Sequence, residues 1–235
     1  MGSNARWERL SVNEGQMDVF MDIPKGIGVF PAVIVAHHRA GNDVATTKFV
    51  QDLAANGYVA ASPNLHHRRP KGEDTRVSLK NLDDVEIVND LKAVVSMLTA
   101  SVSVMEKRLA IVGHCMGGRV SFLGASEIEA IACNVVYYSG NMFKIWGKGD
   151  KTPFEKIAKL RGPTLGFFGQ DDENPSIKDV ARIEKKLFEE GIPHEFHTYE
   201  GCGHAFQNFT SPDNYRAKAT EDSFKKMIVW LGKNL

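Results

Sequence analysis

The sequence lacks the features of a secreted or membrane-bound protein. Its three cysteines, Cys115, Cys133 and Cys202, form neither a paired disulfide framework nor a CxxC metal motif. No stretch approaches the roughly 18 consecutive apolar residues of a membrane span, and the N-terminus has no apolar signal-peptide core. We therefore expect a cytoplasmic protein without a membrane partner, in which each thiol serves either packing or chemistry.

A surplus of charge of one sign is also missing. Lys and Arg together number 29, as do Asp and Glu, so the formal net charge at pH 7 is zero. A general nucleic-acid binder needs a positive surplus, so no nucleic-acid partner is expected. The hydrophobic and charged fractions of 43% and 25% are those of a globular protein and exclude wholesale disorder.

The predicted elements begin with an antiparallel pair and continue as alternating strands and helices. Residues 7–24 alternate apolar and polar positions about a turn at 13–15, which predicts a β-hairpin. Short apolar runs predict buried strands, and apolar stripes at helical spacing predict helices. The further predicted strands are 31–37, 58–65, 108–113, 135–138, 163–168 and 194–199, and the predicted helices are 43–56, 81–99, 116–125, 177–190 and 214–233.

This order is typical of one α/β domain over residues 1–235, with a mostly parallel, doubly wound sheet flanked by helices. Residues 66–80 are polar and basic and are expected to form a loop. In the predicted helix 81–99, the buried stripe is expected to consist of Leu82, Val85, Val88, Leu91, Val94, Val95 and Leu98.

A candidate nucleophile follows the strand 108–113. Residues 113–118, Gly-His-Cys-Met-Gly-Gly, match the strand–turn–helix pattern G-x-S-x-G with Cys115 in the nucleophile position. Glycine at 113 and 117 permits the sharp reversal, and the helix N-terminus lowers the pKa of a thiol. The backbone N–H of Met116 would then be one oxyanion donor. The alternative is a buried structural cysteine in a tight turn.

A base and an acid are available at the same edge of the predicted sheet. Asp171 and Asp172 follow the strand 163–168, and His204 follows the strand 194–199. In folds that contain this strand–turn–helix segment, the nucleophile elbow, the catalytic residues follow in the chain order nucleophile, acid, histidine. Ligands of open α/β sheets bind at the carboxyl ends of the strands, where all three groups are expected here. Chemistry alone leaves open which aspartate faces inward, because either could cap the helix near Ser176. The alternative for His204 is a solvated loop histidine.

Taken together, these residues resemble the dienelactone hydrolase family of α/β-hydrolases, over roughly residues 15–233. The most specific piece is the 113–118 segment, where most α/β-hydrolases carry serine instead of cysteine. The acid loop G-x-x-D matches residues 169–172 and selects Asp172, and G-H-x-F matches residues 203–206 with Phe206 at its end. The resemblance implies a triad of Cys115, Asp172 and His204.

The resemblance also implies a second oxyanion donor and a substrate site. The donor would be the N–H of Arg39, in the loop after the strand 31–37. The type enzyme has a glutamate where this chain has His38, so control of the thiol's protonation must differ, with a second imidazole as one way to stabilise the thiolate. Of the two arginines that hold the lactone carboxylate, one matches Arg68 and the other is Asn208, which puts the diene lactone in doubt as a substrate.

Basic residues follow two of the predicted strands. His37, His38 and Arg39 end one, and residues 66–69, His-His-Arg-Arg, follow the next. Such a basic rim favours anionic substrates. The alternative is that several of these side chains simply point into solvent. A metal site is not expected, because adjacent histidines on a strand point to opposite faces. The expected substrate-binding residues are His38, His66, Arg68, Phe206 and Asn208.

Two aromatic residues, Phe143 and Trp146, lie in the segment 141–155 between a strand and a helix. They either roof the pocket or pack the loop.

The leading interpretation is a hydrolase of small, anionic carboxylic esters or lactones, acting without a cofactor through an acyl-enzyme on Cys115. A monomer or a homodimer is expected. A thioesterase or an activated-phosphoester hydrolase with the same triad is the second interpretation. A non-catalytic protein that binds ligands or senses redox state is the third.

Overall fold

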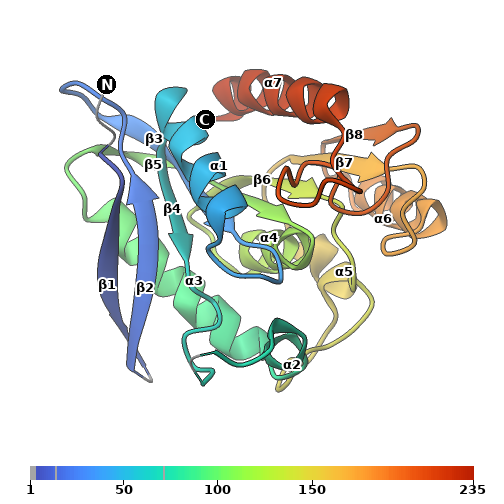
Figure 1. Ribbon diagram of the computed structural model, residues 1–235, viewed down its shortest axis with the longest axis horizontal. Coiled ribbons are helices and arrows are strands. Elements are labelled where there is room, and N and C mark those ends of the chain that lie inside the picture. The colour runs from blue at the N-terminus through green and yellow to red at the C-terminus, as the bar shows by residue number, and fades with distance from the viewer. Residues whose placement is uncertain (1–3, 14, 71) are drawn as a thin grey trace.

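A computed structural model describes residues 4–13, 15–70 and 72–235 (Figure 1). Its centre is an eight-stranded sheet with the order β1-β2-β4-β3-β5-β6-β7-β8. The strands are β1 (Arg6–Val12), β2 (Gly15–Asp22), β3 (Phe30–Ala36), β4 (Val59–Pro63), β5 (Val104–His114), β6 (Ile131–Tyr137), β7 (Thr164–Gly169) and β8 (His194–Tyr199). The helices are α1 (Val44–Ala55), α2 (Thr75–Lys80), α3 (Asp84–Thr99), α4 (Met116–Glu127), α5 (Pro153–Lys156), the 3₁₀ helix η1 (Ile157–Lys159), α6 (Ile177–Glu189) and α7 (Ala217–Asn234).

The sheet is parallel except at its start. β2 pairs antiparallel with both β1 and β4, and every pair from β4 through β8 is parallel. This confirms the predicted hairpin and the mostly parallel α/β sheet, although position 14 of the hairpin turn lies outside the described residues. Because all the later strands point the same way, the loops after them meet at one edge of the sheet.

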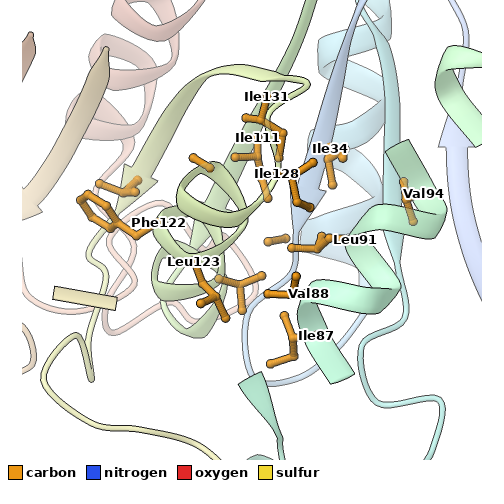
Figure 2. Packing of buried hydrophobic residues seen from close by; sticks show 14 of the residues in the cluster. Ile34, Ile87, Val88, Leu91, Val94, Ile111, Phe122, Leu123, Ile128 and Ile131 are labelled. Atoms are coloured by element: carbon orange, nitrogen blue, oxygen red, sulfur yellow. The ribbon is translucent and has the colours of Figure 1, made fainter. Parts of the chain in front are cut away.

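Alternation along the strands builds a core on each face of the sheet. Ile34 and Ile111 pack with Leu91 of α3 and Leu123 of α4, as Figure 2 shows, and residues of α6 belong to the same core. Val33 and Val35 face the opposite way, against α1 and α7 (Figure 1). A period of two in a strand produces this division, so the continuous apolar runs of the sequence are explained by burial on both faces.

The structure corrects two details of the sequence analysis. Part of the expected loop 66–80 is the helix α2, whose start is capped by Asp74, since the Asp74 side chain accepts a hydrogen bond from the N–H of Arg76. In α3, Val85 is 46% exposed, and Ile87 occupies the buried face instead. The helix begins at Asp84, so Val85 lies in its first turn beside the capping residue Asp83.

A fully buried ion pair fixes the segment that follows β6. Arg119 of α4 pairs with Asp84 of α3, and its Nη2 also donates to the carbonyl oxygen of Lys144 at 2.6 Å. The guanidinium carbon lies 3.8 Å from the ring centroid of Trp146. Trp146 therefore packs the loop against α4. Phe143 packs the same loop against Phe154 of α5, with 4.8 Å between the ring centroids. Neither Phe143 nor Trp146 lines the large cavity described below.

No helix in the described part of the chain combines the length and apolar character needed to cross a membrane.

Replacing Arg119 by Met is expected to lower the free energy of unfolding by about 3–5 kcal/mol, because Asp84 would stay buried without its partner. Denaturant unfolding of the wild type and the variant measures this difference. Arg161→Met is the matched control, since Arg161 is exposed and makes no ion pair with a described residue. Equal losses in both variants would contradict the structural role of the pair.

Candidate active site

The turn between β5 and α4 places Cys115 at the helix N-terminus in a left-handed conformation, with φ 56° and ψ −116°. A Cβ atom at Gly113 would lie 1.8 Å from the carbonyl oxygen of Gly117, and one at Gly117 would lie 1.9 Å from that of Ala36. No side chain fits at either position. The two glycines that the sequence analysis singled out are therefore required by the close approach of three backbone segments.

The Cys115 sulfur is surrounded by hydrogen-bond donors from three loops. The His204 side chain, from the loop after β8, bonds to the sulfur, as do the backbone N–H groups of Met116 and Arg39. Met116 begins α4 and Arg39 follows β3, so the two N–H groups come from opposite sides of the elbow. The structure thus brings together the predicted nucleophile, base and backbone donors in one place.

Asp172 orients the imidazole of His204. Its Oδ2 lies 2.8 Å from His204 Nδ1, and its Oδ1 accepts a hydrogen bond from the N–H of Asn174 at 2.9 Å. Asp172 is buried, whereas the neighbouring Asp171 is exposed. Ser176, and neither aspartate, caps α6. The geometry therefore agrees with Asp172 as the aspartate that faces inward.

The electrostatics of the site favour charge separation between Cys115 and His204. Burial raises the pKa of the Cys115 thiol, but the hydrogen bond and positive charge of His204, together with the backbone N–H groups of Met116 and Arg39, outweigh it and lower the pKa below its ordinary value. Burial lowers the pKa of His204, but hydrogen bonds and charges from Asp172 and Cys115 outweigh it and raise that pKa. Both directions favour a thiolate beside an imidazolium.

A cavity of about 1140 Å³ opens over these groups at the carboxyl edge of the sheet. Cys115, His204, Tyr138 and Asn208 line it, together with residues of α1 and of the loop before α7. His38 also lines it, and its Nε2 lies 3.0 Å from Asp43 Oδ2. Two of the expected substrate-binding residues, His38 and Asn208, therefore do border the cavity.

The other three expected substrate-binding residues, Phe206, Arg68 and His66, do not line the cavity. Phe206 is fully buried, with its ring 5.3 Å from that of Tyr138. The guanidinium of Arg68 makes two hydrogen bonds to Asp90 of α3, at 2.6 and 2.9 Å. The imidazole Nε2 of His66 lies 3.0 Å from the carbonyl oxygen of Arg39. Partners elsewhere in the fold hold the side chains of Arg68 and His66.

The rest of the expected basic rim is likewise engaged. His67 is buried against Asp90, with 3.0 Å between Nε2 and Oδ2. His37 is fully buried: its Nδ1 donates to the carbonyl oxygen of His38, and its Nε2 accepts from the N–H of Leu65. Burial lowers the pKa of His37 to about 3, with the nearby His66 adding to the effect, so the ring is neutral. Among the described residues, no group of three or more His, Cys, Asp or Glu side chains could hold a metal ion.

Several cavity residues were not among the candidates of the sequence analysis, and one of them lies beside the imidazole of His204. Tyr138 follows β6 with a positive φ of 39°, and its ring lies edge-on to that of His204 at 5.2 Å. The available signal was its place directly after a strand at the carboxyl edge, beside the other candidate residues.

Comparison with known proteins places the chain among hydrolases. The model of the dienelactone hydrolase family matches residues 17–235. A Methylorubrum extorquens protein, provisionally named a carboxymethylenebutenolidase, is 25% identical over 94% of this chain and 78% of its own length. A Bradyrhizobium protein, provisionally named 2-oxo-3-(5-oxofuran-2-ylidene)propanoate lactonase, is 26% identical over 96% of this chain and 92% of its own length.

A solved structure shows the same fold. The crystal structure of a Klebsiella pneumoniae protein, provisionally described as a dienelactone hydrolase, aligns with a TM-score of 0.90 at 24% identity, over 99% of both chains. The fold, the family model and the named relatives all point to the same family. The chain belongs to the dienelactone hydrolase family of α/β-hydrolases and is a hydrolase of esters or lactones.

Proposed function

We propose that the protein hydrolyses carboxylic esters or lactones by nucleophilic catalysis with Cys115, His204 and Asp172. The observation that carries the proposal is the hydrogen-bonded series from Asp172 through His204 to the Cys115 sulfur, at the floor of the cavity. This is the arrangement of nucleophile, base and orienting acid that acyl transfer requires.

In the first half of the reaction, the Cys115 thiolate attacks the carbonyl carbon and a C–S bond forms. The electron pair of the carbonyl bond moves to oxygen, and the N–H groups of Met116 and Arg39 stabilise that oxyanion. Both already bond to the sulfur, so they lie close to where the oxyanion develops. The C–O bond then breaks, and the imidazolium of His204 gives its proton to the leaving oxygen.

In the second half, His204 accepts a proton from water as the water attacks the thioester. Collapse of this second oxyanion releases the carboxylic acid and restores the Cys115 thiolate with a protonated His204. Asp172 keeps Nδ1 of His204 protonated throughout and stabilises the imidazolium. No group outside the chain takes part except water.

The charges around the cavity revise the expected preference for anionic substrates. The acidic residues in its lining are Asp43, Asp52, Asp171, Asp172, Glu173 and Glu221. The lysine and the arginine in the lining are Lys48, which is bonded to Asp52 at 2.7 Å, and Arg39. Because Arg68 is held by Asp90, a pair of arginines does not meet a substrate carboxylate here. We therefore propose esters or lactones of low charge as the substrates.

Replacing Cys115 by Ala is expected to abolish the hydrolysis of p-nitrophenyl acetate and the acetyl adduct seen by intact mass, because both need the sulfur. Cys202→Ala is the control, since Cys202 is buried and lies outside the cavity lining. Turnover that survives in Cys115→Ala would overturn the proposed nucleophile.

Asp172→Asn is expected to lower kcat by about 10³–10⁴-fold, because it removes the acceptor that keeps His204 in the correct tautomer. Asp171→Asn, one residue away and exposed, is expected to retain nearly full activity. Steady-state kinetics of the two variants decide between the aspartates, and a larger loss in Asp171→Asn would show that the acid is assigned to the wrong residue.

The lowered pKa of Cys115 predicts alkylation by iodoacetamide at a pH below the ordinary thiol range. The rate should rise with pH as the thiolate forms, and the midpoint should move to higher pH in His204→Asn, which loses the neighbouring cation. Peptide mass mapping follows each thiol separately. Cys133 and Cys202 are internal controls, because burial raises the pKa of both. An unchanged midpoint in His204→Asn would refute the ion pair.

A further inference from the structure

Tyr138 breaks the alternation of the strand that it follows. Val135 and Tyr137 of β6 face the core under α1 and α7, while Val136 faces the other side. Alternation would turn residue 138 to the side of Val136, yet Tyr138 packs in the same core as Tyr137. The positive φ of Tyr138 produces this change of direction. Such a backbone is unfavourable for tyrosine, and strained residues of this kind gather at functional sites.

The strained backbone is held in place by its neighbours. The N–H of Tyr138 donates to the carbonyl oxygen of Phe167 at 2.8 Å, and the N–H of Cys115 donates to that of Tyr137 at 3.0 Å. The ring of Tyr138 lies edge-on to His204 and to Phe206, at 5.2 and 5.3 Å. The position of the ring is therefore fixed relative to both the elbow and the imidazole.

The hydroxyl of Tyr138 lacks a hydrogen-bond partner among the described residues, although the residue is 98% buried and lines the cavity. Its neighbour Tyr137 differs: that hydroxyl donates to the carbonyl oxygen of Ser223 at 3.3 Å, and Tyr137 does not line the cavity. The Tyr138 hydroxyl is not among the side-chain atoms that are both buried and without a partner, so it is accessible from the cavity that the residue lines. It is therefore free to donate to a molecule bound there.

The strand order tells which part of a substrate the hydroxyl meets. Arg39 follows β3 on one side of β5, the strand that leads to Cys115. Tyr138 follows β6 on the other side, between Cys115 and the loops that carry Asp172 and His204. The oxyanion donor Arg39 thus lies on one side of the sulfur, and His204 with Tyr138 on the other. The leaving oxygen must reach His204 to be protonated, so it lies on the side of Tyr138.

We propose that Tyr138 is a further catalytic residue, whose O–H donates a hydrogen bond to the leaving oxygen of the ester or lactone. The proposal rests on the hydrolase mechanism above. As the C–O bond breaks, its electron pair stays on the leaving oxygen, which takes the proton of the His204 imidazolium. Tyr138 keeps its own proton throughout and stabilises the negative charge that develops on that oxygen.

The surroundings of the hydroxyl suit a donor that is never ionised. Burial raises the pKa of Tyr138 well above its ordinary value, and the negative charges of Cys115, Tyr137 and Asp172 add to that rise. The group therefore remains an O–H at neutral pH.

A series of substituted phenyl acetates, from p-nitrophenyl to p-methoxyphenyl, tests the proposal with Tyr138→Phe. All of these esters form the same acetyl-enzyme, so kcat/KM isolates the step in which the leaving group departs. p-Nitrophenolate departs with little need of a donor, and we expect its kcat/KM to change by less than about twofold. For the most basic phenol we expect a loss of about tenfold or more, as for one hydrogen bond to a developing charge. The plot of log kcat/KM against leaving-group pKa should therefore be steeper in the variant.

Tyr137→Phe is the matched control, because it removes the same atom one residue away and outside the cavity lining. Its plot should run parallel to that of the wild type. A plot for Tyr138→Phe that runs parallel to that of the wild type, however far below it, would overturn the proposal, since a packing defect lowers all rates alike. Cys115→Ala is run on the same series: turnover that persists there would refute the cysteine mechanism itself, an outcome distinct from a parallel plot for Tyr138→Phe.

Discussion

The site depends on the contact of three backbone segments around Cys115: the end of β5, the first turn of α4 and the end of β3. A carbonyl oxygen fills the space beside Gly113 and another fills the space beside Gly117, so these segments touch without intervening side chains. The contact fixes the nucleophile at the helix N-terminus and brings the loop after β3, with the N–H of Arg39, to the same sulfur. The cavity, the base and the acid are arranged around this fixed point.

The elements and the core of the site could be predicted from the sequence because local patterns determine them. Apolar runs such as 31–37 indicate strands covered on both faces, and parallel strands bring the loops that follow them to one edge. The elbow glycines, His204 and the aspartate pair all follow such strands. Chain order and strand direction were therefore enough to predict that the residues meet, although chemistry alone did not separate Asp171 from Asp172.

What the sequence could not show depends on distances between residues far apart in the chain. Residues 66–69 have no periodicity that indicates where their side chains point, and Asp90 is 22 positions beyond Arg68. The helix α3 brings that carboxylate under the loop and binds Arg68 and His67, so a rim that is basic in sequence presents little free positive charge. Tyr138 was missed for a related reason: its direction follows from one left-handed residue, which the sequence pattern of a strand does not reveal.

In the turn between β5 and α4, different residues carry the steric constraint and the chemistry, and this separation has an evolutionary consequence. The glycines bear the steric constraint, and the left-handed backbone of residue 115 is equally unfavourable for cysteine and for serine. A single nucleotide change exchanges these two amino acids, and it would leave the turn, the backbone donors and the imidazole in place. The fold can therefore exchange thiol for hydroxyl chemistry through a change at one codon, whereas any substitution at Gly113 or Gly117 removes the turn on which either chemistry relies.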